Sequence, residues 1–200
     1  MQITSDKITG VILAGGESRR MAGQDKGLIK LAHIPMLEYI IKTFNPQVSN
    51  LIINANRNHE QYAKYGLKII TDELSGFCGP LAGMAATLPV IDTEYMVTVP
   101  CDSPFIPDDL VARLSTALLK ENADISVAHS GERLQPVFCL LSKAVSPSLN
   151  TYLKNGERKI DRWFAQQHTA IADFSDIPET FDNINTPIDL EHALSKLDTH

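Results

Sequence analysis

The chain has 200 residues, 44% of them hydrophobic and 21% charged, which predicts one globular domain over residues 1–200 with a sizeable core. Its 18 basic and 24 acidic side chains give a formal net charge of −6, a balance that disfavours a general nucleic-acid-binding protein. No apolar run approaches the length that spans a bilayer, and the N-terminus lacks a signal-peptide core, so we expect a cytoplasmic protein without membrane segments.

Segments typical of strands alternate with segments typical of helices along the chain. In chain order the sequence predicts a strand at 8–13, a helix at 36–41, a strand at 51–53, a polar helix at 58–65, a strand at 68–71, a helix at 81–88, a strand at 95–99, a helix opening at 107–109, strands at 124–128 and 134–141, helices around 143–153 and 157–167, a strand at 169–173 and a helix at 187–197. This alternation predicts an α/β fold of three α/β/α layers, with a mainly parallel, Rossmann-like central sheet.

Two of these helices have recognisable beginnings. Pro35 suits the first turn of the helix at 36–41, where its missing N–H is not needed. Asp108 and Asp109 fall where a helix dipole favours negative charge, so we expect them to cap the helix after Pro107.

The cysteines and histidines do not indicate a metal site or a disulfide framework. Cys78, Cys101 and Cys139 are odd in number and far apart, so we expect each to pack as a small apolar residue in a reducing cytosol. The six histidines include no His-x-x-x-His pair, which disfavours a metal site built from histidine.

The most informative segment follows the first strand. That strand runs into Gly15 and Gly16, and three cations, Arg19, Arg20 and Lys26, follow within ten residues of Gly16. Residues 14–27 carry a local net charge of +1 in an acidic chain. Because backbone N–H groups and cations can converge on an anion there, the segment predicts a phosphate-binding loop. The alternative is a tight turn followed by a solvated basic surface.

Two common phosphate-binding motifs do not describe this loop. A Walker A motif places Ser or Thr after its lysine, whereas Gly27 follows Lys26. Residues 15–20 also lack the Gly-x-Gly-x-x-Gly spacing of a dinucleotide-binding loop.

Polar residues end three further predicted strands. Asn54, Asp72 and Asp102 each follow an apolar run, and parallel strands collect such ends in one crevice with the glycine loop. Asp102 suits Mg²⁺, which takes one or two carboxylates together with phosphate oxygens and water. Each residue also has a structural interpretation, as a turn former or as the cap of a turn.

The segment Leu13-Ala14-Gly15-Gly16, which continues to Arg20-Met21 and Asp25-Lys26, resembles the loop of sugar-nucleotide-type nucleotidyltransferases. Within that superfamily it resembles the molybdenum cofactor guanylyltransferases. Similar pieces at 79–83, 134–138 and 181–187 extend the resemblance over nearly the full chain.

The resemblance implies a nucleotide site in which Leu13 and Ala14 offer backbone groups to guanine and Asn54 lies beside the nucleotide. We expect Asp72 to contact the nucleotide or to position groups around the metal. The remaining site residues handle the phosphates and catalysis: Gly15, Gly16, Arg20, Lys26 and the Mg²⁺-binding Asp102.

The resemblance also implies contacts with a pterin acceptor. The residues concerned are Gly79, Pro80, Leu81, Gln135, Asn183 and Asn185. Structural interpretations compete here too, since residues 79–81 suit a helix start and Thr186-Pro187-Ile188-Asp189 suits a helix cap.

The reaction so implied transfers GMP from GTP to the terminal phosphate of molybdopterin and releases pyrophosphate. The alternatives are a molybdopterin cytidylyltransferase or a sugar-phosphate nucleotidyltransferase, a nucleotide-sensing module without chemistry and, least favoured, a protein-interaction scaffold. Similar enzymes imply a molybdopterin-loading protein and recipient molybdoenzymes or their chaperones as partners.

Overall fold

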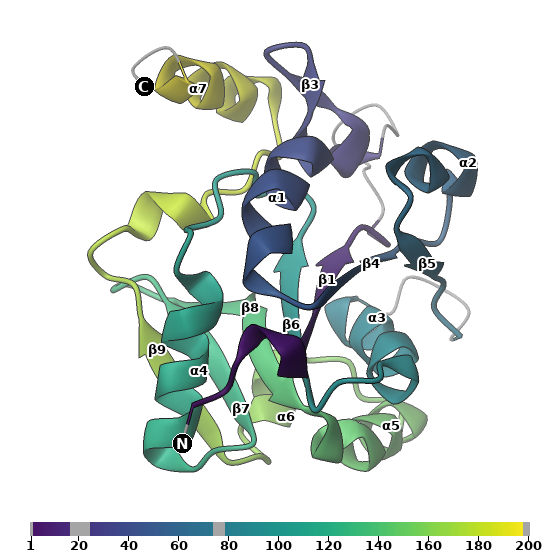
Figure 1. Cartoon of the computed structure of the whole chain (residues 1–200), viewed down its shortest axis with the longest axis vertical. Coiled ribbons are helices and arrows are strands. Elements are labelled where there is room, and N and C mark those ends of the chain that lie inside the picture. The colour runs from purple at the N-terminus through teal and green to yellow at the C-terminus, as the bar shows by residue number, and fades with distance from the viewer. Residues whose placement is uncertain (1, 17–24, 74–78, 198–200) are drawn as a thin grey trace.

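The computed structural model describes residues 2–16, 25–73 and 79–197, and a single sheet forms the centre of that part of the chain (Figure 1). Its seven strands lie in the order β5 (Lys68–Ile70), β4 (Asn50–Asn54), β1 (Ile8–Leu13), β6 (Tyr95–Pro100), β8 (Leu134–Ser142), β7 (Ile125–His129) and β9 (Thr169–Asp173). Strand β8 runs antiparallel to β6 and β7, whereas the other pairings of this sheet are parallel. The mainly parallel α/β sheet that the sequence predicts is therefore confirmed.

Helices cover both faces of the sheet (Figure 1). On one face α1 (Met36–Phe44) and α4 (Leu110–Glu121) pack on a core that includes Ile12 of β1. On the other face α3 (Pro80–Thr87), α5 (Ser146–Lys154) and α6 (Ile160–Phe164) pack on a core that includes Val11. Adjacent residues of a strand point to opposite faces, so β1 contributes to both cores and is buried along its whole length.

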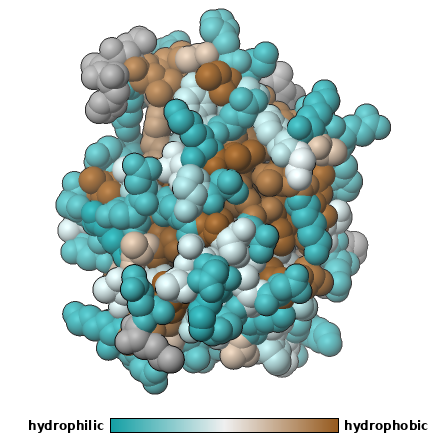
Figure 2. All heavy atoms as spheres, viewed as in Figure 1, coloured by the Kyte–Doolittle hydropathy of each residue, from teal (hydrophilic) through white to brown (hydrophobic). Residues whose placement is uncertain are grey.

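The surface over α1 is only partly polar. Figure 2 shows an apolar area that extends from α1 toward β4 and β5 on this face. Ile41, Leu67 and Ile69 pack on the underlying core and stay partly exposed.

Smaller elements complete the fold. Strands β2 (Lys30–Leu31) and β3 (Ile34–Pro35) form a hairpin that packs with α7 (Pro187–Leu197) in a third apolar cluster, and α2 (His59–Tyr62) follows β4. Short 3-10 turns occur at Ser5–Lys7, Lys26–Leu28, Asn45–Gln47, Ala63–Tyr65, Leu88–Val90, Lys143–Val145 and Pro178–Phe181. Among the described residues, no helix is long and apolar enough to cross a membrane.

The predicted strands and helices are present, with shifted ends, but the predicted caps differ. The helix α1 begins at Met36 as predicted, whereas Pro35 directly precedes it and pairs with Lys30 in β3 instead of lying in the first turn. Asp109 precedes α4 but caps no backbone N–H, because its carboxylate accepts instead from Nε of Arg113, 2.7 Å away. Asp108 lies outside the helix, which begins at Leu110.

The strand order sets where a ligand can bind. From β1 the chain first builds β4 and β5 on one side, then returns through α3 to place β6 on the other side of β1. The helical connections diverge at this point, which opens a crevice at the carboxyl ends of β1 and β6.

Candidate nucleotide-binding site

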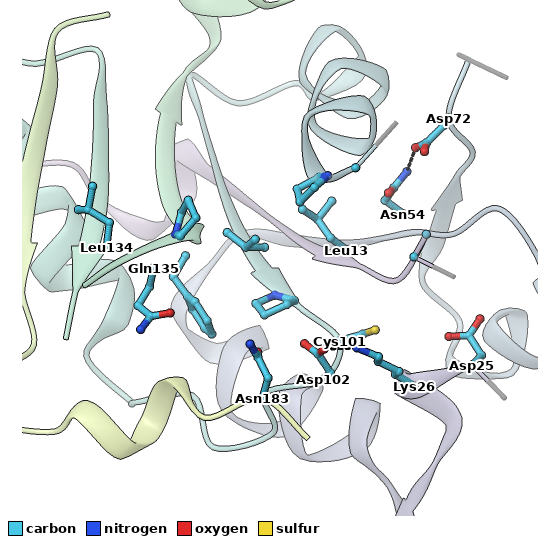
Figure 3. Close-up of a pocket in the computed structure, with 18 of the residues that line it drawn as sticks. Leu13, Asp25, Lys26, Asn54, Asp72, Cys101, Asp102, Leu134, Gln135 and Asn183 are labelled. Atoms are coloured by element: carbon cyan, nitrogen blue, oxygen red, sulfur yellow. Dashed lines mark hydrogen bonds and ion pairs between the residues drawn. The ribbon is translucent and has the colours of Figure 1, made fainter. Parts of the chain in front are cut away.

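A cavity of about 540 Å³ opens at the carboxyl ends of the central strands (Figure 3). Most of the predicted site residues line it: Leu13, Gly15, Gly16, Lys26, Asn54, Asp72, Gly79, Pro80, Asp102, Gln135 and Asn183. The expectation that four strand ends converge in one crevice therefore agrees with the geometry. Ala14 and Leu81 are buried beside the cavity rather than in its lining, and Arg20 lies outside the described residues.

Lys26 and Asp102 meet inside this cavity. Lys26 begins a 3-10 turn, and its Nζ lies 2.8 Å from Oδ2 of Asp102, two residues beyond the end of β6. Nζ also donates to Oδ1 of Asn185, which brings the segment before α7 onto the same ammonium group. A lysine ammonium only donates hydrogen bonds, so the Asn185 atom that faces it must be the oxygen.

The surroundings of Asp102 fit the coordination that Mg²⁺ prefers. The described residues contain no cluster of three or more histidine, cysteine or acidic side chains that could enclose a metal ion. Mg²⁺ does not need one, because it commonly takes one or two carboxylates and completes its shell with water and phosphate oxygens. The Asp102 side chain is 14% exposed to the cavity, so its carboxylate can serve as such a ligand.

Asn54 and Asp72 form a hydrogen-bonded network at the ends of β4 and β5. Nδ2 of Asn54 donates to Oδ1 of Asp72 (2.9 Å) and to the Ile70 carbonyl (3.1 Å), and Figure 3 draws the first of these bonds. Asn56 binds the other Asp72 oxygen at 2.9 Å and accepts from the Asp72 N–H. The Asn54 amide nitrogen is therefore used inside the protein, where it orients the Asp72 carboxylate.

The backbone at the end of β1 is partly committed to the sheet. The Ala14 N–H donates to the Asn54 carbonyl at 2.8 Å, and the Leu13 carbonyl accepts from the Cys101 N–H at 3.2 Å. Contacts from this segment to a base would therefore use the Ala14 carbonyl or the N–H groups of Gly15 and Gly16.

Asp25 is a buried part of the site that sequence reasoning did not assign. Its Oδ1 accepts from the hydroxyl of Tyr62 at 2.7 Å, and Oδ2 lies 3.5 Å from Nε of Arg57. Burial is the main cause that raises the pKa of Tyr62, so this hydroxyl stays a donor. The contact holds the residue before Lys26 against α2. Asp25 stood in the loop motif, but the sequence carried no signal for its partner Tyr62.

The far wall of the cavity depends on an irregularity in β8 that the sequence did not indicate. The pairing register with β7 shifts between Val127, opposite Cys139, and Ala128, opposite Gln135. The three residues between these β8 positions, Pro136, Val137 and Phe138, all line the cavity. Bulges of this kind redirect side chains next to ligand sites. The remaining lining residues that were not predicted are Pro100, Cys101, Arg133 and Leu134.

Comparisons with known proteins identify the family of this chain. Residues 10–171 match the model of the MobA-like NTP transferase domain family. Relatives named molybdenum cofactor guanylyltransferase, from Shewanella pealeana and Shewanella sediminis, are 48% and 50% identical over 181 residues, which are 90% of this chain and 90% and 92% of theirs. The crystal structure of molybdopterin-guanine dinucleotide biosynthesis protein A from Archaeoglobus fulgidus superimposes with a TM-score of 0.81 at 21% identity, covering 96% of this chain and all of that one. The family match over residues 10–171 and the relatives that are 48% and 50% identical over 90% of this chain lead to one conclusion: this chain belongs to the MobA-like NTP transferase domain family.

Proposed function

We propose that this protein transfers GMP from GTP to the terminal phosphate of molybdopterin or Mo-molybdopterin, which forms the guanine dinucleotide cofactor and releases pyrophosphate. The relatives that are about half identical over nine tenths of the chain bear the name of this activity. The observation that carries the proposal is the meeting of Lys26 and Asp102 in the cavity at the strand ends. Residues 1–200 act as a single nucleotidyltransferase domain in this proposal.

The first task of the site is to bring two anionic substrates together. Lys26, Arg20 and the backbone N–H groups of Gly15 and Gly16 neutralise the triphosphate. In the structure Lys26 is shared between Asp102 and Asn185, so the phosphates compete with these oxygens for the ammonium group. Asp72, held by the Asn54 and Asn56 amides, lies at the β5 end of the same cavity. We expect its carboxylate to face the nucleotide.

Asp102 is the residue that would hold Mg²⁺. When bound there with phosphate oxygens, Mg²⁺ supplies positive charge that stabilises the departing pyrophosphate. The acceptor phosphate is already ionised at neutral pH, so the site requires no general base. Positioning and electrostatics then supply most of the rate enhancement.

The acceptor lies between the β8 wall and the segment before α7. Gln135 of β8 and Asn183 of the segment before α7 line the cavity, and Gly79 and Pro80 line it at the start of α3. Leu81 is fully buried in the core, so its part is to anchor the start of α3 beneath the site.

The proposed compartment is the cytoplasm, and the proposed partners are a molybdopterin-loading protein and recipient molybdoenzymes or their chaperones.

Cys101 and Cys139 are buried free thiols. Burial raises the pKa of Cys101, and it raises that of Cys139 to about 12, so both thiols stay protonated and inert.

One incubation tests the proposal. Purified protein is mixed with GTP, Mg²⁺ and molybdopterin, and the product is identified by mass while pyrophosphate release is followed. A guanine dinucleotide product supports the proposal. A product made only from CTP or UTP in parallel reactions would identify a cytidylyl- or uridylyltransferase instead. Tight GTP binding without pyrophosphate release would indicate a nucleotide sensor.

A further inference from the structure

Ser103 is a buried hydroxyl beside the proposed metal ligand. Its residue has no exposed surface, and it directly follows Asp102. Its Oγ donates to Oδ1 of Asn183 at 2.7 Å, a contact between residues that are 80 positions apart. Next to it, the Ile184 N–H donates to the Asp102 carbonyl at 2.8 Å. Two hydrogen bonds thus fasten residues 183–184 to residues 102–103.

This contact places the oxygen of the Asn183 amide against Ser103. Asn183 lines the cavity, and Figure 3 shows its side chain directed into the pocket from the segment before α7. A side-chain amide has one accepting oxygen and one donating nitrogen. With the oxygen occupied by Ser103, the nitrogen is the group left for a ligand.

The polarity matters because the proposed acceptor is an anion. An amide NH₂ group donates to phosphate oxygens, whereas an amide oxygen in the same place would repel them. Without a partner the Asn183 side chain could rotate and present either end. Because Ser103 already holds the Asn183 side chain, binding of the acceptor does not have to restrict its rotation, and the entropy cost of binding is lower.

We infer that Ser103 is a positioning residue, which holds Asn183 so that its amide nitrogen donates to an oxygen of the acceptor phosphate. The inference rests on the proposed function. Ser103 and Asp102 are consecutive residues. The hydrogen bond from Ser103 therefore also fixes the distance between the Asn183 amide nitrogen, which donates to the acceptor phosphate, and the Asp102 carboxylate, which serves the nucleotide phosphates. Ser103 itself touches neither substrate.

The test separates binding of the acceptor from binding of the nucleotide. For S103A we expect the dissociation constant and the KM of molybdopterin to rise about fivefold, the effect of one neutral hydrogen bond of about 1 kcal/mol, with the KM of GTP within twofold of wild type. Calorimetric titration gives the dissociation constant without turnover. A rise in the KM of GTP that equals the rise for molybdopterin would show a general structural defect and overturn the inference.

Ser126 provides a matched control. It is also fully buried, and its Oγ donates to the Leu114 carbonyl at 2.8 Å, but it does not line the cavity. S126A therefore loses a comparable buried hydroxyl, and it should leave acceptor affinity unchanged. Weaker acceptor binding in S126A equal to that in S103A would overturn the inference.

A double variant tests whether Ser103 acts through Asn183. If it does, adding S103A to N183A should weaken acceptor binding no further than N183A alone does. N183D should weaken acceptor binding more than N183A does, because a carboxylate repels phosphate. A full fivefold effect of S103A in the N183A background would refute the inference. Failure of the proposed function is distinguishable, because the wild-type protein itself would then not bind molybdopterin.

Discussion

Replacing Gly83 by alanine should displace side chains that line the proposed nucleotide site. Gly83 lies in α3 where the helix crosses the ends of β1 and β4, and it is buried. A methyl group at this position would lie 2.2 Å from Oδ1 of Asn54 and 2.9 Å from Cδ2 of Leu13. Asn54 cannot yield freely, because its amide is bonded to the Ile70 carbonyl and to Asp72. Either the helix moves outward or these hydrogen bonds break.

The magnitude follows from three terms. Overpacking a well-packed core costs about 1–3 kcal/mol, and each hydrogen bond that Asn54 loses costs about 1 kcal/mol. Alanine recovers about 1 kcal/mol because it favours a helix interior over glycine. The net loss of unfolding free energy is about 2 kcal/mol, which lowers the Tm of a chain of this size by about 4–8 °C.

Thermal and urea unfolding measure the stability of G83A, and initial rates measure its KM for GTP. We expect the KM to rise, since Asp72 loses the amide that orients it. G16A is the control for the stability measurements alone, because nothing lies within 4 Å of a methyl group at Gly16 and the fold should accept it. If G83A melted at the wild-type temperature and bound GTP normally, the proposed close approach of α3 would be wrong.

Four further variants test the site and its supports. D102N keeps the side-chain shape but should abolish Mg²⁺-dependent turnover with the circular dichroism spectrum unchanged; wild-type activity would remove Asp102 from the metal role. K26A should raise the dissociation constant of GTP about tenfold or more, the value of one charge-assisted hydrogen bond, with little change in Tm; unchanged GTP affinity would contradict the role of Lys26. Y62F removes only the hydroxyl that donates to Asp25. We expect this variant to fold and to have a higher KM for GTP than wild type, and an unchanged KM would contradict the role of this contact. Backbone N–H groups before α7, that of residue 185 first, lower the pKa of Asp189. The contribution of the Asp189 carboxylate to stability is fully present above the pKa that this group has in the unfolded chain. It is lost as the pH falls through the lower pKa of the folded state, so the Tm difference between wild type and D189N should shrink in acid.

Much of the fold could be predicted from local patterns. The apolar runs at 8–13 and 95–99 form central strands as predicted. Thr186 with Asp189 forms the predicted helix cap, with reciprocal bonds of 2.8 and 3.2 Å. The convergence of strand-end residues also followed from sequence, because parallel strands place their carboxyl ends at one edge.

Only the tertiary structure decided which side chains touch. The contact of Lys26 with Asn185 spans 159 positions, and those of Tyr62 with Asp25 and Ser103 with Asn183 span 37 and 80. No sequence pattern predicts the register shift between β7 and β8 that places three residues of β8 in the cavity lining. Periodicity and turn chemistry act over a few residues and therefore determine elements and their ends. The partners of buried polar groups depend instead on how distant elements pack, which no local pattern encodes.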